Sequence, residues 1–168
     1  VLYYAMSVWG GEQTCGIGVA TANSPQGPFT DHGKMFRSNE IGVQNSIDPS
    51  LLQYEGRNYL VWGSFRGIYV IELTTDGLSI MPGAKKKRIA GTAFEAVYIH
   101  KHDDYYYMFA SIGSCCQGVK STYKVVVGRS KKVWGPYKDK TGKPMLKNGY
   151  SLVIGANDHF VGNGHGSQ

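Results

Sequence analysis

Two stretches of this chain repeat each other at an offset of 47 residues, and the repeat places an acid at the same point of each copy. Asp48 stands near the start of the first copy, and Glu95 near the start of the second. Each copy continues in register into a charged turn and then an aromatic strand: residues 54–57 and 59–64, and residues 101–104 and 106–111. A chain built from such units can bring both carboxylates to one shared axis.

A second repeat, at an offset of 108 residues, pairs residues 19–31 with residues 127–139. Each copy reads as a strand, a polar turn and a Gly-Pro-aromatic start of a further strand. Together the repeats describe units of about 40 to 50 residues with four strands each, which is typical of a β-propeller. The 12 Tyr and 23 Gly residues and the short apolar runs also favour an all-β chain.

The repeats predict that residues 1–168 are part of one propeller domain of four-stranded antiparallel blades. Residues 2–7 match the second strand of an earlier blade, whose inner position falls before Val1. Residues 162–167 read as the opening of another inner strand. We therefore expect the trailing part of one blade, two full blades and the start of another. A propeller closes only with four or more blades, so we expect the missing blades to lie outside this chain.

The net charge of +6 is unevenly spread, because residues 105–147 contain nine Lys or Arg and one acid, Asp139. A basic face could bind nucleic acid or another anionic polymer, although solvated strand edges are the more common explanation. The basic run Lys85–Arg88 is expected in a charged loop or at a sheet edge. No stretch approaches the roughly 20 apolar residues that span a bilayer.

The three cysteines, Cys15, Cys115 and Cys116, do not form a metal-binding set, because a zinc site needs four ligands at recognisable spacing. A bridge between the neighbours Cys115 and Cys116 is geometrically strained, and a bridge from Cys15 to either leaves one thiol over. We interpret Cys115 and Cys116 as two buried small apolar residues in a tight loop.

Asp48 and Glu95 are both flanked by apolar residues, where carboxylates are rarely buried without a reason. Asp48 alone could cap the turn at Pro49, and Glu95 alone could form a buried ion pair. Their equivalence in the repeat favours one shared site instead. Glycoside hydrolysis needs a pair of acids, one of which protonates the leaving oxygen. The apolar neighbours of Glu95 favour the protonated form that this role requires.

His165 stands between two glycines at the start of the expected inner strand. A single His is usually structural or merely exposed. Its small neighbours would nevertheless let the imidazole reach the axis, where it could bind a metal or hold the waters of a hydrated calcium ion.

Four segments in this order resemble glycoside hydrolase family 43, whose members are five-bladed propellers that act on arabinan, arabinoxylan and xylan side chains. The segments are residues 46–50, 94–99, 113–130 and 164–167. The third segment, which contains Gly113-Ser114-Cys115-Cys116-Gln117-Gly118, is especially similar to the endo-arabinanases and their close relatives.

The resemblance implies an inverting hydrolase of α-L-arabinofuranosidic or β-xylosidic bonds, with Glu95 as general acid and Asp48 as modulator of the acid's pKa. It implies that His165 lies by a calcium ion and that the protein is secreted or periplasmic. Further residues are expected to contact the sugar: Asn45, Ser46, Trp62, Phe65, Tyr98, Ser114 and Cys115.

No residue of the chain matches the family's general base, an Asp of the first blade, so we expect the isolated chain to be inactive. Two other functions remain open. A sugar-binding propeller without catalysis would keep Trp62, Phe65 and Tyr98 in its pocket. A nucleic-acid binder would show steeply salt-dependent binding.

Overall fold

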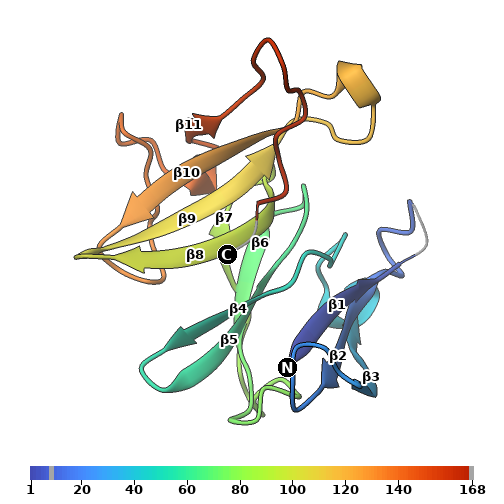
Figure 1. Ribbon diagram of the computed structural model, residues 1–168. Helices are drawn as coiled ribbons and strands as arrows, with labels where there is room; N and C mark the ends of the chain where they lie inside the picture. The colour runs from blue at the N-terminus through green and yellow to red at the C-terminus, as the bar shows by residue number, and fades with distance from the viewer. Residues whose placement is uncertain (8–9, 167–168) are drawn as a thin grey trace.

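Three antiparallel β-sheets make up the computed structural model, which describes residues 1–7 and 10–166 (Figure 1). The first sheet contains β1 (Leu2–Met6), β2 (Gly16–Thr21) and β3 (Thr30–Arg37). The second contains β4 (Ser50–Tyr54), β5 (Arg57–Trp62), β6 (Ile68–Glu72) and β7 (Lys87–Ala90). The third contains β8 (Glu95–His102), β9 (Tyr105–Ile112), β10 (Lys124–Ser130) and β11 (Ser151–Ile154).

Helical structure in the described residues is limited to short turns. These are α1 (Ser38–Ile41) and the 3-10 turns η1 (Gly118–Lys120) and η2 (Met145–Lys147). None of these segments is long and apolar enough to cross a membrane. The predicted all-β fold with antiparallel sheets is confirmed.

The repeat of 47 residues is visible in the two hairpins that open the second and third sheets. Tyr54 pairs with Arg57 across a two-residue turn, and His102 pairs with Tyr105 in the same way. The turn residues Glu55 and Asp103 both have positive φ, 50° and 48°, as a tight β-hairpin requires. Both predicted charged turns and the aromatic strands that follow them are therefore confirmed.

Alternation along β5 explains how the three sheets pack. Successive side chains of a strand point to opposite faces of its sheet. Leu60 and Trp62 belong to a core shared with Ile17 and Phe36 of the first sheet, whereas Val61 belongs to a second core shared with the third sheet. Full burial of each such side chain contributes about 1.5–3 kcal/mol. The second sheet is thus covered on both faces, and the sheets stack in chain order as propeller blades do (Figure 1). The number of blades and the domain boundaries stay predictions.

Two predicted strands differ in the structure. After Gly135-Pro136, only Lys138 pairs with Arg129, because the Asp139 side chain accepts backbone N–H bonds from Thr141 and Lys143 and turns the chain. The outer edge of the third sheet is instead β11, which pairs with β10.

The expected inner strand at residues 162–167 is represented by one bridge, from Asn163 to Lys124, and Ser167 lies outside the described residues. The basic run at residues 85–88 ends in β7, so Lys87 and Arg88 are exposed at a sheet edge as expected.

Candidate functional site

Asp48 and Glu95 meet where the second and third sheets adjoin. Glu95 is the first residue of β8 and is 8% exposed, whereas Asp48 lies two residues before β4. The backbone N–H of Ala96 donates to Asp48 Oδ2 at 3.1 Å, so the Asp48 side chain is tied to the start of β8. Asp48 and Ala96 have φ of 56° and 49°, in the left-handed region. Such backbone outliers cost energy and are concentrated at functional sites.

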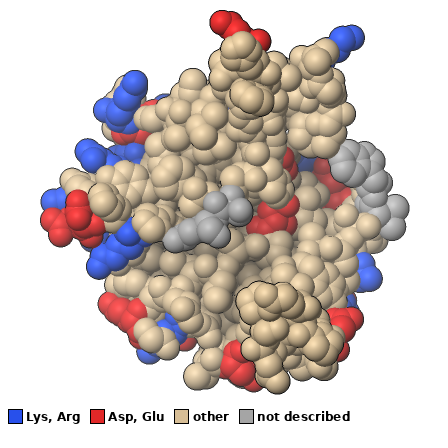
Figure 2. Space-filling model, in the orientation of Figure 1, with Lys and Arg blue, Asp and Glu red and all other residues tan. Residues whose placement is uncertain are grey.

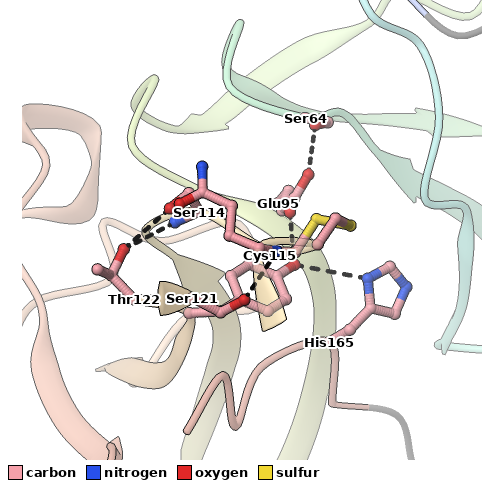
Figure 3. Close-up of a disulfide and its surroundings, with 10 residues drawn as sticks. Ser64, Glu95, Ser114, Cys115, Ser121, Thr122 and His165 are labelled. Atoms are coloured by element: carbon pink, nitrogen blue, oxygen red, sulfur yellow. Dashed lines mark hydrogen bonds between the residues drawn. A yellow bond between two sulfur atoms is a disulfide. The ribbon is translucent and has the colours of Figure 1, made fainter. Parts of the chain in front are cut away.

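Two neutral hydroxyl groups hold the Glu95 carboxyl group. Ser64 Oγ, just beyond the end of β5, donates to Oε2 at 2.6 Å, and Tyr123 Oη donates to Oε1 at 2.5 Å (Figure 3). No ion pair found in the described part of the chain includes Glu95. The buried ion pair considered as an alternative role for Glu95 is therefore absent there.

The pKa of Asp48 is raised above its ordinary value of 3.8, chiefly because burial disfavours the charged form and also because Glu95 is negative. His165 and the Ala96 N–H bond act in the opposite direction. Two acids in one buried place compete for ionisation, so the charge of one depends on the protonation of the other.

His165 reaches the same site through a second serine. Ser64 and Ser111 are 47 residues apart and lie at the same end of equivalent strands, Ser64 just after β5 and Ser111 near the end of β9. Ser64 donates to Glu95, whereas Ser111 Oγ accepts the backbone N–H of His165 at 2.7 Å. His165 Nδ1 lies 3.5 Å from Tyr123 Oη. The structure thus places His165 beside the two acids, held by the serine that is the repeat equivalent of Ser64.

The donor set around His165 does not form a metal centre on its own. No group of three or more His, Cys, Asp or Glu side chains in residues 1–7 and 10–166 is arranged to hold a metal ion. Calcium takes six to eight oxygen ligands, and the imidazole supplies nitrogen. The calcium ion expected beside His165 stays a prediction that rests on this residue alone.

The interpretation of Cys115 and Cys116 as buried thiols is wrong. The two residues form a disulfide, Cys116 is exposed, and Cys115 is half-buried. Hydrogen bonds between Ser114 and Thr122 close the loop. The loop lies at the surface and not in a core. Cys15 is the buried free thiol, and its sulfur lies 3.1 Å from Ser38 Oγ. Glu95 and His165 are among the surroundings of the disulfide (Figure 3).

Trp62 and Ser46 are not available as the predicted sugar contacts. Both are 0% exposed, and Trp62 Nε1 donates to Ser46 Oγ at 3.1 Å. The Trp62 ring packs against Phe36 of the first sheet, with centroids 5.3 Å apart. The sequence could not distinguish this core tryptophan from a pocket aromatic, because both stand at the end of a strand.

The other predicted contacts lie nearer to the surface. Asn45 is half-buried, and its side-chain N–H donates to the carbonyl of Ser64 at 3.0 Å. Tyr98 is also half-buried and stacks on Phe109 with centroids 5.0 Å apart. Phe65 is half-buried and has a φ of 50°. Whether these residues, Ser114 and Cys115 contact a sugar stays a prediction.

Sequence reasoning missed Ser64 and Tyr123 as members of the site. Ser64 could have been found from the repeat, since it closes the second strand of its unit as Ser111 does. Tyr123 has no such signal, because it is brought to Glu95 from 28 residues further along the chain.

Charged atoms are unevenly distributed over the face seen in Figure 2. Acidic atoms lie in the hollow near its centre, whereas most Lys and Arg atoms lie towards its edge. On this face most of the basic atoms therefore lie away from the central hollow.

The geometry defines a pair of acids, one buried and one half-buried, at the junction of antiparallel sheets, and comparison with known proteins shows the family of the chain. The family model described as glycosyl hydrolases family 43 matches residues 1–168. The chain belongs to this family.

Its relatives include several arabinan-degrading enzymes. An extracellular endo-α-(1→5)-L-arabinanase of Bacillus subtilis is 39% identical over 97% of this chain and 52% of its own length. An extracellular exo-α-(1→5)-L-arabinofuranosidase of Cellvibrio japonicus is 40% identical over 99% of this chain and 54% of its own length. The chain therefore spans about half the length of these relatives.

A solved structure extends the likeness to three dimensions. The α-L-arabinanase of Cellvibrio cellulosa in complex with arabinohexaose superposes with a TM-score of 0.87 at 35% identity. The match covers 97% of this chain and 58% of that one.

Proposed function

We propose that this chain supplies the general acid, Glu95, and its modulator, Asp48, to an inverting hydrolase of arabinan. The observation that carries the proposal is the Glu95 carboxyl group, which is buried, held by neutral hydroxyls and adjacent to a second acid. The relatives named above act on α-(1→5)-linked arabinan, which supports the choice of bond.

In this mechanism Glu95 gives its proton to the glycosidic oxygen as the bond from that oxygen to the anomeric carbon breaks. Water attacks the same carbon from the opposite face and loses its proton to a base. We assign that base to a carboxylate outside this chain, so residues 1–168 alone would be inactive. Asp48 orients the start of β8 through Ala96 and, when charged, favours retention of a proton by the neighbouring acid.

The substrate would lie over the exposed side of this pair. Tyr98, Phe65 and Asn45 offer half-buried surfaces for a sugar, and Ser114 and Cys115 lie on the loop beside Glu95. The arabinohexaose complex of the Cellvibrio cellulosa structure supports an oligosaccharide ligand. Since two relatives are named as extracellular, we also propose that the full-length protein is secreted.

The test uses the full-length protein and its Glu95→Gln variant on linear arabinan, arabinoxylan and aryl glycosides. We expect the variant to lose about 10²- to 10⁴-fold in kcat on arabinan, which is the usual contribution of a general acid. The matched control is Glu72→Gln, which removes a surface carboxylate paired with Arg57 at 3.3 Å and should leave kcat unchanged.

Near-normal hydrolysis by Glu95→Gln would remove this residue from the acid role. Activity on xylosidic bonds alone would replace arabinan as the substrate. Oligosaccharide binding without turnover by the wild-type protein would favour a sugar-binding propeller instead.

A further inference from the structure

Tyr123 is a buried tyrosine whose hydroxyl group points into the acidic site. Its side chain is 4% exposed, and it precedes β10 directly. The ring is covered by the final segment of the chain, since a Cβ built on Gly164 would lie 2.1 Å from it. This close approach leaves the ring little freedom, so the hydroxyl position is fixed by packing.

The Tyr123 hydroxyl contacts two groups of the site at once. It donates to Glu95 Oε1 at 2.5 Å, and the same phenol oxygen lies 3.5 Å from His165 Nδ1. A phenol can both donate and accept a hydrogen bond. It can therefore donate to Glu95 when that group is charged. When Glu95 carries a proton, the phenol oxygen can accept it in a hydrogen bond and turn its own O–H towards His165.

The phenol itself keeps its proton at the pH values at which Glu95 would act as an acid. Burial, followed by the hydrogen bond to Glu95, raises the pKa of Tyr123 well above its ordinary value of 10.0. Tyr123 therefore remains a neutral hydroxyl when Glu95 gains or loses a proton.

We propose that Tyr123 is a positioning residue, whose hydroxyl group holds the Glu95 carboxyl group in place for proton transfer to the glycosidic oxygen. This inference rests on the acid role of Glu95 proposed above. Ser64 restrains the other carboxylate oxygen, so the two hydroxyls together fix the plane of the carboxyl group. Since a proton donor must be aligned with the leaving oxygen, such restraint acts on kcat more than on KM.

The decisive variant is Tyr123→Phe in the full-length protein, which keeps the ring and removes only the hydroxyl. We expect kcat on linear arabinan to fall roughly 10- to 100-fold with little change in KM, as for loss of a hydrogen bond to a charged group. The alkaline limb of the pH profile of kcat/KM should move to higher pH, because a donor to the charged carboxylate is lost. The loss should shrink for aryl arabinosides with activated leaving groups, which need little acid assistance.

Tyr137→Phe is the matched control. Tyr137 is also fully buried, but its hydroxyl donates to the backbone carbonyl of Val133 at 2.5 Å, away from Glu95. This variant should lose stability without a change in the pH profile. Equal kinetic losses in both variants, or a Tyr123→Phe enzyme with wild-type kcat and pH profile, would overturn the proposal.

A spectroscopic measurement separates this proposal from the proposed hydrolase activity. The side-chain carboxyl carbon of Glu95 can be followed by NMR during a pH titration of ¹³C-labelled protein and assigned with Glu95→Gln. In Tyr123→Phe the titration midpoint should shift to higher pH, whether or not the protein cleaves arabinan. An unchanged midpoint would reject the role of Tyr123 even if hydrolysis by Glu95 were established.

Discussion

The hydroxyl of Ser50 donates to the backbone carbonyl of Val97 at 2.7 Å, and these two residues occupy the same position in consecutive repeats. Ser50 begins β4, and Val97 is the third residue of β8. The bond therefore joins the first strands of two neighbouring sheets close to Asp48 and Glu95, which stand two residues before Ser50 and Val97.

Removal of this bond should separate the sheets slightly. Ser50→Ala is expected to lower the free energy of unfolding by about 1 kcal/mol, as for loss of one partly buried hydrogen bond. Urea unfolding of the full-length protein measures the effect. The control is Ser79→Ala, because Ser79 is exposed and its hydroxyl makes no hydrogen bond among the described residues. Equal stabilities of the two variants would show that the Ser50 bond contributes nothing.

Trp62→Phe should affect stability rather than sugar binding. The smaller ring leaves a void against Phe36 and removes the donor to Ser46, which together should cost about 2–4 kcal/mol. Thermal unfolding and the Kd for arabino-oligosaccharides should be measured on the same samples. A large rise in Kd with unchanged stability would restore Trp62 to the sugar pocket.

Asp48→Asn should stabilise the protein increasingly as the pH rises. Because the pKa of Asp48 is raised on folding, the folded protein holds this proton more tightly than the unfolded chain. The wild-type free energy of unfolding therefore falls as the pH rises above the ordinary value of 3.8, and the variant lacks this loss. Urea unfolding between about pH 3.5 and 7 measures the difference.

Asp139→Asn is the control of opposite sign. The pKa of Asp139 is lowered, chiefly by its hydrogen bond from Thr141, so its stabilising effect is lost as the pH falls. Compared with the wild type, this variant should lose more free energy of unfolding at neutral pH than at acid pH. The same pH trend in both variants would contradict the burial of Asp48 as the cause.

The disulfide predicts the labelling pattern of the cysteines. Of the three cysteines in residues 1–168, only Cys15 should be alkylated when the oxidised protein is denatured, and all three should react after reduction. Peptide mapping by mass spectrometry distinguishes these outcomes. In Cys15→Ser, the oxidised protein should show no labelling within this segment. Labelling of Cys115 and Cys116 without reductant would exclude the bond.

Much of the fold could be predicted because short sequence patterns mark its turns and its repeated units. The turn residues Glu55 and Asp103 mark the hairpins, and the two repeats mark the units that become sheets. The outer strand β11 was missed because its pairing with β10 depends on the turn that Asp139 makes, which no periodic pattern reveals.

Only the site residues that occupy equivalent positions in the repeat could be predicted from the sequence. Asp48 and Glu95 were found because they occupy equivalent positions, and the structure confirms that they are neighbours. Trp62 was misplaced because a strand covered on both faces gives no sign of which aromatic meets solvent. Tyr123 was missed because its role depends on a contact between segments distant in the chain.

The serines at the strand ends have a consequence for how such a chain can diversify. A hydroxyl can both give and receive a hydrogen bond, so Ser64 holds a carboxylate while Ser111, at the same position, holds a backbone N–H. The two repeats therefore share the serine and differ in the group that it holds. A side-chain carboxylate in one repeat and a backbone N–H in the next are thus held from the same strand position, so a change of held group needs no change of the residue that holds it.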